Sequence, residues 1–276
     1  MLWVEGPLSY VEQLCAKSFL DAGHEVTLYH YGKVDRVPEG VSLEHGDSIL
    51  RQDNFIQHNR TGSMALFSDV FRYHLLTQTD RTIWADTDAY CVKPFETETG
   101  HYYGWESEHH INGGVLGLPQ DSPALANLLE MTRNEYFIPQ WYSDAAKAKL
   151  QARQDAGDPV HVGDLPWGTW GPHAITHHVH ATGEDKYAFP REVLYPIPFE
   201  MRRQMVKAGK RTAAESYLTP RTASIHLYGR RIREFLASRP EGMPDAGGLI
   251  DHLLQKHGID PREAPIPVKE KAEAEG

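Results

Sequence analysis

Residues 2–32 read LWVEGPLSYVEQLCAKSFLDAGHEVTLYHYG, and their pattern decides the fold. Residues 2–4 predict a short strand, after which Ser9 and Glu12 have the spacing of a capping box at the start of an amphipathic helix. The β-branched and aromatic run at residues 25–31 predicts a second strand. A strand, a helix and a strand within about 30 residues make a βαβ unit. We therefore expect an α/β fold with a mostly parallel sheet.

The composition is that of a globular protein, with 40% hydrophobic and 24% charged residues in a chain of 276. The formal net charge of -10 argues against nucleic acid as a partner, because Lys and Arg hold that ligand. Cys15 and Cys91 predict neither a disulfide framework nor a CxxC metal site. The first residues lack the pattern of a signal peptide, and no stretch of about 18 apolar residues occurs. We expect a cytoplasmic protein with no transmembrane segment.

Helix and strand patterns alternate along the rest of the chain. Residues 138–171 differ, because Pro, Gly and Trp surround a polar helical stretch near residues 145–154, as in an active-site lid or an acceptor-binding insertion. The other expected elements are helices at residues 65–76, from residue 121 and after Arg230, and strands at residues 82–85, 193–199 and 223–228.

Asp86 and Asp88 follow directly after a predicted strand. The carboxyl ends of parallel strands are where open α/β sheets bind ligands. Residues two apart in an extended chain point to the same side, so both carboxylates can face one hard cation such as Mg²⁺ or Mn²⁺. That cation would neutralise charge on a departing diphosphate. The D-x-D pattern is also common in surface turns, so the motif needs its context.

A polar stripe on the helix at residues 65–76 supplies part of that context. Ser68, Asp69 and Arg72 lie on one face, while apolar residues cover the rest of the helix. A charged pair on so apolar a helix costs desolvation, which favours a ligand with hydroxyl groups as its partner. The alternative is a purely structural ion pair between Asp69 and Arg72.

The stretches that stand out occur in the order LWVEG (2–6), ALFSDVFRYHLL (65–76), TIWADTDAYCVKPF (82–95), INGGVLGLP (111–119), WGPHAIT (170–176) and SIHLYG (224–229). In this order and spacing they resemble the motifs of DXD-containing sugar transferases of glycosyltransferase family thirty-two. That family includes fungal α-mannosyltransferases and animal α-galactosyltransferases, and it is similar to the catalytic domains of glucosylating clostridial toxins. Two departures are Trp84, where most members have Tyr, and residues 78–81, which replace a Gly-Gly turn.

The resemblance implies a GT-A fold, with a Rossmann-like nucleotide-binding half, a mostly parallel central sheet flanked by helices, and an acceptor-binding elaboration. It implies a retaining enzyme that uses Mn²⁺ or Mg²⁺ and moves a hexose from a nucleotide sugar to a glycan or glycolipid, as in polysaccharide synthesis. A UDP-hexose is the preferred donor and GDP-mannose the other, and peripheral contact with the cytoplasmic membrane face fits such an acceptor. We expect one domain at residues 1–259, divided into a donor part (1–120) and an acceptor or lid part (121–259), with a flexible tail at 260–276.

The resemblance also implies residue roles. Asp69, Arg72 and Asp88 are the catalytic candidates, and Asp86, Asp88 and His226 are the metal-ligand candidates. Ordinary core positions are the alternative for His226 and for Trp3, the candidate for stacking on the donor base. Glycines allow close backbone approach and an amide can both donate and accept. The donor-binding candidates are Trp3, Ser68, Asp69, Arg72, Asp86, Asn112, Gly113, Gly114 and Gly229.

Trp167, Trp170 and His173 are candidates for an acceptor platform, because aromatic faces pack against the C–H faces of sugars. Simple anchoring of the loop is the alternative. The histidines at residues 109–110 and 177–180 are not accompanied by Cys or carboxylates at zinc-site spacing. We predict that they are polar surface residues or neighbours of a site.

No residue in these motifs is a convincing nucleophile, so a front-side displacement is the working mechanism. Two other functions fit parts of the pattern. An aspartyl phosphotransferase also places D-x-D after a strand, but Gly-Thr usually follows, whereas Ala89 and Tyr90 follow here. A non-catalytic carbohydrate- or nucleotide-sugar-binding protein would keep the fold and bind the donor without producing a nucleoside diphosphate.

Overall fold

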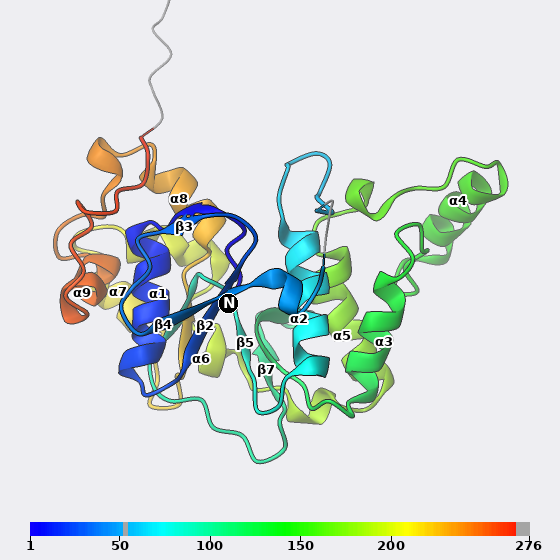
Figure 1. The fold of residues 1–276 in the computed structure, drawn as a ribbon, viewed down its shortest axis with the longest axis horizontal. Coiled ribbons are helices and arrows are strands. Elements are labelled where there is room, and N and C mark those ends of the chain that lie inside the picture. Colours follow the sequence, from blue (N-terminus) through cyan, green and yellow to red (C-terminus); the bar gives the residue numbers. More distant parts are fainter. Residues whose placement is uncertain (52–54, 269–276) are drawn as a thin grey trace, which may run out of the picture. The chain divides into compact units, whose positions relative to one another are not determined.

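The computed structural model describes residues 1–51 and 55–268. They form two compact units, each built from separate stretches of the chain and each containing helices and short strands (Figure 1). The α/β class is thereby confirmed, while the single domain at residues 1–259 stays a prediction. Unit 1 comprises Met1–His45, Ala85–Glu96 and Arg191–Gly276, and unit 2 comprises Gly46–Trp84 and Thr97–Pro190.

Unit 1 begins with the predicted helix and the second predicted strand, whereas the strand predicted at residues 2–4 is reduced to a single bridge. Helix α1 (Tyr10–Asp21) starts at Ser9, and both arms of the capping box are present, because the Ser9 side chain accepts from the helix backbone and the Ser9 N–H donates to Glu12 at 2.8 Å. Strand β2 (Val26–His30) lies parallel to β4 (Val41–His45). Leu2 forms only an isolated parallel bridge to Tyr29. Strand β1 (Gly6–Pro7) pairs in parallel with β3 (Val34–Asp35).

The sheets of the described residues are small. Besides the two parallel pairs, β6 (Ala89–Cys91) pairs antiparallel with β9 (Ser224–His226). Strands β5 (Trp84–Ala85), β8 (Ile111–Gly117) and β7 (Tyr102–Trp105) form one sheet in that order, with β7 and β8 antiparallel. At the place where the βαβ pattern predicted parallel pairing, the structure has only the bridge from Leu2 to Tyr29, and the two parallel ladders join β2 to β4 and β1 to β3. Within residues 1–51 and 55–268 the strands do not join into one parallel sheet.

The strand predicted at residues 193–199 is wrong. Helix α6 (Arg191–Leu194) occupies its first part, and the chain then passes Pro196 and Pro198 into a 3₁₀ helix, η5 (Phe199–Met205). Two prolines remove two backbone donors from a ladder, which explains why the apolar run does not pair. The remaining helices of unit 1 are α7 (Arg211–Glu215), α8 (Gly229–Leu236), η6 (Pro240–Gly242) and α9 (Leu249–Lys256).

The core of unit 1 joins α1 to the C-terminal helices. Leu14 of α1, Ile225 of β9 and Ile250 of α9 are all fully or almost fully buried in one cluster. Ala264 and Ile266, which the sequence analysis placed in a flexible tail, are also buried, and the Tyr10 N–H donates to the Ala264 carbonyl at 2.9 Å. Apolar side chains thus fix this part of the tail. Residues 269–276 lie outside the described residues.

Unit 2 is organised around three helices, α2 (Ala65–Gln78), α3 (Pro123–Thr132) and α5 (Ala174–Ala181), with α3 in contact with both of the others (Figure 1). Helix α4 (Asp144–Asp155) has no buried residue, and Figure 1 shows it at the end of a long excursion from α3. No helix of the described residues is both long and apolar enough to span a membrane. The short helical turns are η1 (Gly46–Ser48), η2 (Val162–Asp164), η3 (Thr169–His173) and η4 (Asp185–Tyr187).

Candidate functional site

Asp86 and Asp88 lie in a tight turn between β5 and β6. The Ala89 N–H donates to the Asp86 carbonyl at 3.0 Å, so the chain bends back within four residues. The extended geometry expected from the sequence is therefore wrong for this segment. Because a turn does not impose the alternation of a strand, the orientation of each carboxylate depends on its own contacts.

Asp88 is fixed by residues far along the sequence. Its Oδ2 accepts a hydrogen bond from the Gly229 N–H at 2.6 Å and lies 3.3 Å from Nε2 of His226. Strand β6 brings the turn beside β9, which ends at His226, and α8 begins at Gly229. A side chain at Gly229 would place its Cβ 2.8 Å from the Cβ of Asp88, so only glycine leaves room for this approach.

Opposing effects act on the Asp88 carboxyl. Burial by itself would raise its pKa, but the His226 ring, the Gly229 N–H and the charge of Arg233 more than offset burial and lower the pKa below its ordinary value. Asp88 is therefore a carboxylate at neutral pH. Arg233, which the sequence analysis did not single out, also pairs with the buried Glu12 and lies over the Trp3 ring, 5.7 Å from its centroid.

The donor set around Asp88 fits a hard cation. Oδ1 of Asp88 is buried and has no hydrogen-bond partner among the described residues, which is unusual for a carboxylate oxygen. No three His, Cys, Asp or Glu side chains of those residues converge on one point. Mg²⁺ and similar ions commonly take only one or two protein carboxylates and complete their shell with water and substrate phosphate. The single carboxylate of Asp88 is compatible with that mode, and His226 lies against its other oxygen.

Unit 2 contains the second group of predicted residues. Asp69 and Arg72 of α2 form an ion pair of 3.4 Å, with side chains only 9% and 6% exposed. The Arg72 guanidinium donates to the carbonyl and the hydroxyl of Ser68, at 3.2 and 3.0 Å, and to the Gly113 carbonyl. It also lies over the Trp84 ring, 4.9 Å from the centroid. The predicted polar stripe is thus a connected group, and a structural role for the pair accounts for all of these contacts.

Two glycines of unit 2 let the backbone pass close to this pair. An added Cβ at Gly171 would lie 3.0 Å from a carboxylate oxygen of Asp69. At Gly113 it would lie 2.9 Å from an Arg72 nitrogen and 2.6 Å from the Ile175 side chain. The close approach predicted for Gly113 therefore serves contacts with Arg72. Asn112 donates to Glu106 at 2.9 Å and accepts from the Gly114 N–H at 2.6 Å, so contacts within the protein engage both ends of its amide.

The three side chains predicted to bind the acceptor have different surroundings in the structure. Trp170 is 1% exposed and packs in an apolar cluster with Leu66 and Leu165, so its ring offers no face to a ligand. Trp167 is 44% exposed and lies near His58. His173 lines a pocket. The sequence could not distinguish these positions, because a tryptophan in a loop can equally anchor that loop.

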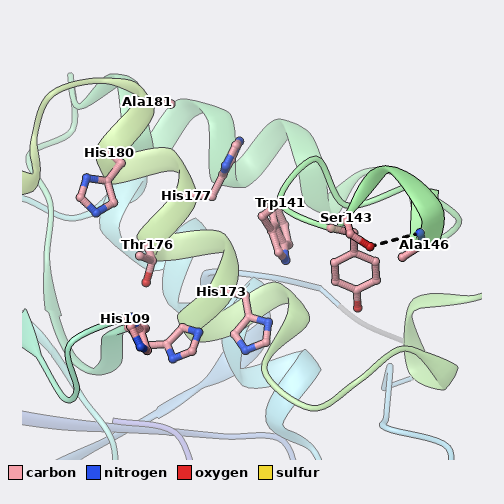
Figure 2. Close-up of a pocket in the computed structure, with 11 residues that line it drawn as sticks. His109, Trp141, Ser143, Ala146, His173, Thr176, His177, His180 and Ala181 are labelled. Carbon is pink, nitrogen blue, oxygen red and sulfur yellow. Dashed lines mark hydrogen bonds between the residues drawn. The ribbon is translucent and has the colours of Figure 1, made fainter. Parts of the chain in front are cut away.

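The pocket is built by three segments of unit 2 (Figure 2). His109 and His110 precede β8, Trp141 and Tyr142 precede α4, and the third segment is the turn of η3 running into α5. The sequence analysis predicted that most of these histidines are polar surface residues or neighbours of a site, and it did not predict the pocket. A signal was present, because His173, Thr176, His177 and His180 have the i, i+3, i+4, i+7 spacing of one helix face. The pocket has a volume of about 840 Å³.

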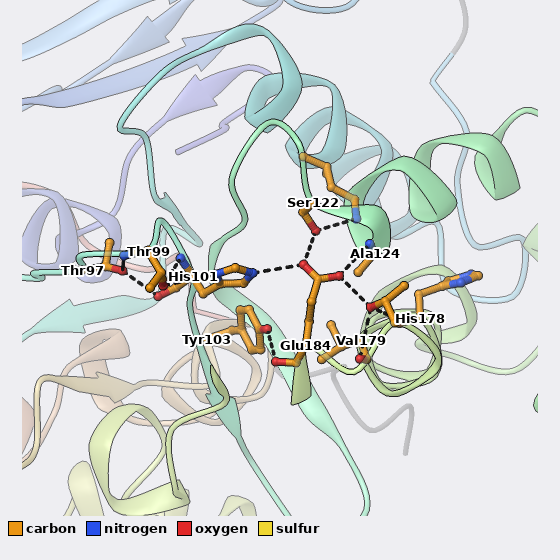
Figure 3. A network of polar contacts seen from close by, with 11 residues as sticks. Thr97, Thr99, His101, Tyr103, Ser122, Ala124, His178, Val179 and Glu184 are labelled. Atoms are coloured by element: carbon orange, nitrogen blue, oxygen red, sulfur yellow. Dashed lines mark hydrogen bonds and ion pairs between the residues drawn. The ribbon is translucent and has the colours of Figure 1, made fainter. Parts of the chain in front are cut away.

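A buried carboxylate anchors the far end of α5 (Figure 3). Glu184 accepts hydrogen bonds from the Ser122 hydroxyl at 2.6 Å, the Ala124 N–H at 2.8 Å and the Thr182 hydroxyl at 2.6 Å, and its Oε1 lies 3.0 Å from His101 Nε2. Burial alone would raise its pKa, but these hydrogen bonds lower the pKa below its ordinary value. Glu184 thereby ties the helix that carries the pocket face to the start of α3.

No family model matches the chain, and no curated protein matches it either. Within unit 1 the structure brings together Asp88, His226 and Gly229, with Trp3 near Arg233. Within unit 2 it brings together Ser68, Asp69, Arg72 and Gly113.

Proposed function

We propose that this chain is a metal-dependent, retaining glycosyltransferase of GT-A type. It transfers a hexose from a nucleotide sugar to a hydroxyl group of a glycan or glycolipid. The observation that carries the proposal is the surroundings of Asp88: a buried carboxylate whose Oδ2 is held by the Gly229 N–H and lies beside His226, and whose Oδ1 has no partner among the described residues. The resemblance of the ordered motifs to family thirty-two implies that this carboxylate binds the divalent cation.

Asp88 and His226 are the residues that would hold the divalent cation, with Asp86 as the further candidate in the same turn. When bound, such a cation supplies positive charge against the diphosphate leaving group. The ordered surroundings of Asp88 matter because a ligand held in place before the reaction needs no reorganisation during it. The Gly229 N–H and the Arg233 charge both keep Asp88 ionised.

In unit 2, Asp69 and Arg72 are the proposed contacts of the donor sugar. Ser68 and the Gly113 carbonyl orient Arg72, and Arg72 pairs with Asp69, so the two side chains would present fixed donors and acceptors to hydroxyl groups. In the proposed front-side displacement, the acceptor oxygen bonds to the anomeric carbon as the bond from that carbon to the phosphate oxygen breaks. The departing phosphate oxygen takes the acceptor's proton, so no protein nucleophile is needed.

The donor proposed is a UDP-hexose, with GDP-mannose as the other choice, and Mn²⁺ or Mg²⁺ as the cation. These choices rest on the resemblance. A reducing compartment such as the cytoplasm is proposed because Cys15 and Cys91 are both buried free thiols. An acceptor in surface-polysaccharide synthesis at the membrane face would fit that location.

The direct test incubates the full chain with UDP-glucose, UDP-galactose, UDP-N-acetylglucosamine and GDP-mannose, with Mn²⁺ or with EDTA, and measures nucleoside diphosphate release. We expect release from one donor with Mn²⁺ and none with EDTA. A thermal-shift series with the same donors should show stabilisation by that donor, because a ligand of the folded state raises apparent stability. Binding without release would identify a non-catalytic binding protein, and neither binding nor release would refute the proposal.

A further inference from the structure

The pocket of unit 2 combines a mostly apolar wall with imidazole and hydroxyl groups. No Asp, Glu, Lys or Arg of the described residues lines it; its polar groups are imidazoles and hydroxyls, and its walls include the rings of Trp141 and Tyr142. A pocket that selects phosphates or carboxylates needs fixed positive charge. The lining side chains of this pocket offer hydrogen bonds from imidazoles and hydroxyls, and Asp185, which does not line it, has its Oδ2 3.1 Å from Nδ1 of His180.

One face of α5 and the turn before it are turned toward this pocket. His173, Thr176, His177 and His180 line it, whereas Ala174, Ile175 and Val179 on the other side are fully buried in the unit (Figure 2). Thr176 has a structural task, because its hydroxyl accepts from the Ile111 N–H at 2.9 Å and donates to the Pro172 carbonyl at 2.6 Å. The face is therefore rigidly mounted.

Two imidazoles on this face, His173 and His177, have pKa values below the ordinary value for histidine, which favours their neutral form. Burial, and then the nearby His110, lower the pKa of His173, while burial and His180 lower the pKa of His177. The rings of His110 and His173 stack at 4.7 Å with an angle of 15° between their planes. Within the described residues, the ring nitrogens of His173 and His177 make no hydrogen bond. A neutral imidazole both donates and accepts, as a hydroxyl group does.

The volume of the pocket and its aromatic wall also fit a saccharide. A volume of about 840 Å³ lies within the usual range for ligand pockets and admits more than one sugar ring. The Trp141 ring centroid lies 5.3 Å from that of His177 and 6.5 Å from that of Tyr142, and Figure 2 shows Trp141 beside His177. An indole beside hydrogen-bonding groups suits a ligand with an apolar C–H face and a polar rim.

We propose that this pocket is a binding site for an uncharged saccharide, which packs on Trp141 and hydrogen-bonds to His173 and His177. The claim that this pocket binds the acceptor of a transferase rests on the function proposed above. The claim that it binds a saccharide depends only on residues of unit 2. η3 connects it to the donor-sugar candidates, because Gly171 of that turn packs against Asp69 while His173 of the same turn lines the pocket.

The test measures binding of neutral methyl glycosides and disaccharides (the methyl glucosides, galactosides and mannosides, lactose, maltose and cellobiose) to the full chain by saturation-transfer NMR and calorimetry, without any nucleotide sugar. We expect at least one to bind, with affinity reduced about tenfold or more in Trp141→Ala and severalfold in His177→Ala. Tyr136→Ala is the matched control, because Tyr136 is an exposed aromatic of the same unit outside the pocket lining. It should bind as the unchanged protein does.

Several results would overturn the inference. The inference is refuted if no neutral saccharide binds, or if Trp141→Ala binds the saccharide as tightly as the unchanged protein does. It is also refuted if glucuronate binds more tightly than glucose. Finally, it is refuted if the unchanged protein binds a nucleoside or Zn²⁺ and the Trp141 and His177 variants lose that binding instead. Should Trp141→Ala fail to fold by circular dichroism, Trp141→Phe and His177→Ala decide the question. Saccharide binding without diphosphate release from any donor would keep this site and refute the transferase, whereas release with no saccharide binding would do the reverse.

Discussion

The cluster around Asp88 in unit 1 and the histidine pocket of unit 2 use histidine in opposite ways. In the cluster, one imidazole lies 3.3 Å from a buried carboxylate, and a glycine backbone closes over that carboxylate. In the pocket, imidazoles adjoin one another and an indole, and no carboxylate or cationic chain of the described residues lines the wall. The same side chain therefore adjoins a buried carboxylate in a tightly packed cluster in one unit, and in the other it lines a pocket together with aromatic rings and hydroxyl groups.

This difference separates two kinds of ligand. A buried carboxylate with an unsatisfied oxygen attracts a cation, and a cation in turn attracts a diphosphate. An uncharged pocket with imidazole donors and acceptors attracts hydroxyl groups. The proposed transferase would need both kinds of recognition, and the residues proposed for each lie within one unit. The substitutions below test the contrast.

Removing the charge of Asp88 should have the largest effect. Asp88→Asn keeps the shape of the side chain but loses the negative charge that a cation needs, so Mn²⁺-dependent diphosphate release should fall by about 100-fold or more. Saccharide binding in unit 2 should be unchanged. Asp158→Asn is the control, because Asp158 is an exposed partner of Arg153. Retained activity in the Asp88 variant would refute the role given to it.

Truncating Glu184 should destabilise unit 2. Glu184→Ala leaves the buried partners of its carboxylate without an acceptor, so the free energy of unfolding should fall by about 3 kcal/mol in urea. Glu130→Ala, which removes an exposed ion pair with Arg133, should cost less than about 0.5 kcal/mol. Because the folded protein lowers the Glu184 pKa from 4.5, its contribution is complete above pH 4.5 and is lost as the pH falls below that value. Equal stability of the two variants would contradict the anchoring role.

His178 should make unit 2 sensitive to mild acid. Its Nε2 is buried without a partner among the described residues, and burial, followed by the nearby His177, lowers its pKa from 6.5 to about 4. Between these values the unfolded chain binds the proton and the folded chain does not, so stability falls as the pH drops from 6.5 toward 4. After allowance for solvent screening, the loss should be about 1–2 kcal/mol. Denaturation of His178→Phe at both pH values should lack this component, and an unchanged pH dependence would contradict the assignment.

Trp84→Phe should have the smallest effect. A smaller ring weakens the contact with the Arg72 guanidinium, so the donor KM should rise about threefold while kcat changes little. The free energy of unfolding should fall by about 1 kcal/mol, because Trp84 is only 1% exposed. Trp105→Phe is the control, since no guanidinium of the described residues lies over its ring. A rise in KM in the control alone would contradict the role of Trp84.

Local signals predicted several elements well. The capping box at Ser9 and Glu12, the start of α3 after Ser122 and the helix at residues 65–76 depend on neighbours within a few residues, and all three are confirmed. The prediction of a strand at residues 193–199 was wrong. It was based on the apolar character of the run and gave too little weight to Pro196 and Pro198, which cannot donate hydrogen bonds to a neighbouring strand. The tail was misjudged from residue 260 because its polar composition concealed the two buried side chains, Ala264 and Ile266.

The candidate site divides in the same way. The sequence identified Asp88, His226 and Gly229 individually, and it placed Asp69 and Arg72 on one helix face from their spacing alone. It did not reveal that the Gly229 N–H, 141 residues further along the chain, donates a hydrogen bond to the Asp88 carboxylate. Nor did it reveal the pocket, whose walls come from three segments. Helix faces, caps and turns are set by interactions over a few residues, so the sequence by itself determined them. Burial, pKa and the orphaned oxygen of Asp88 depend on which distant segments pack together, and only the tertiary structure decided those.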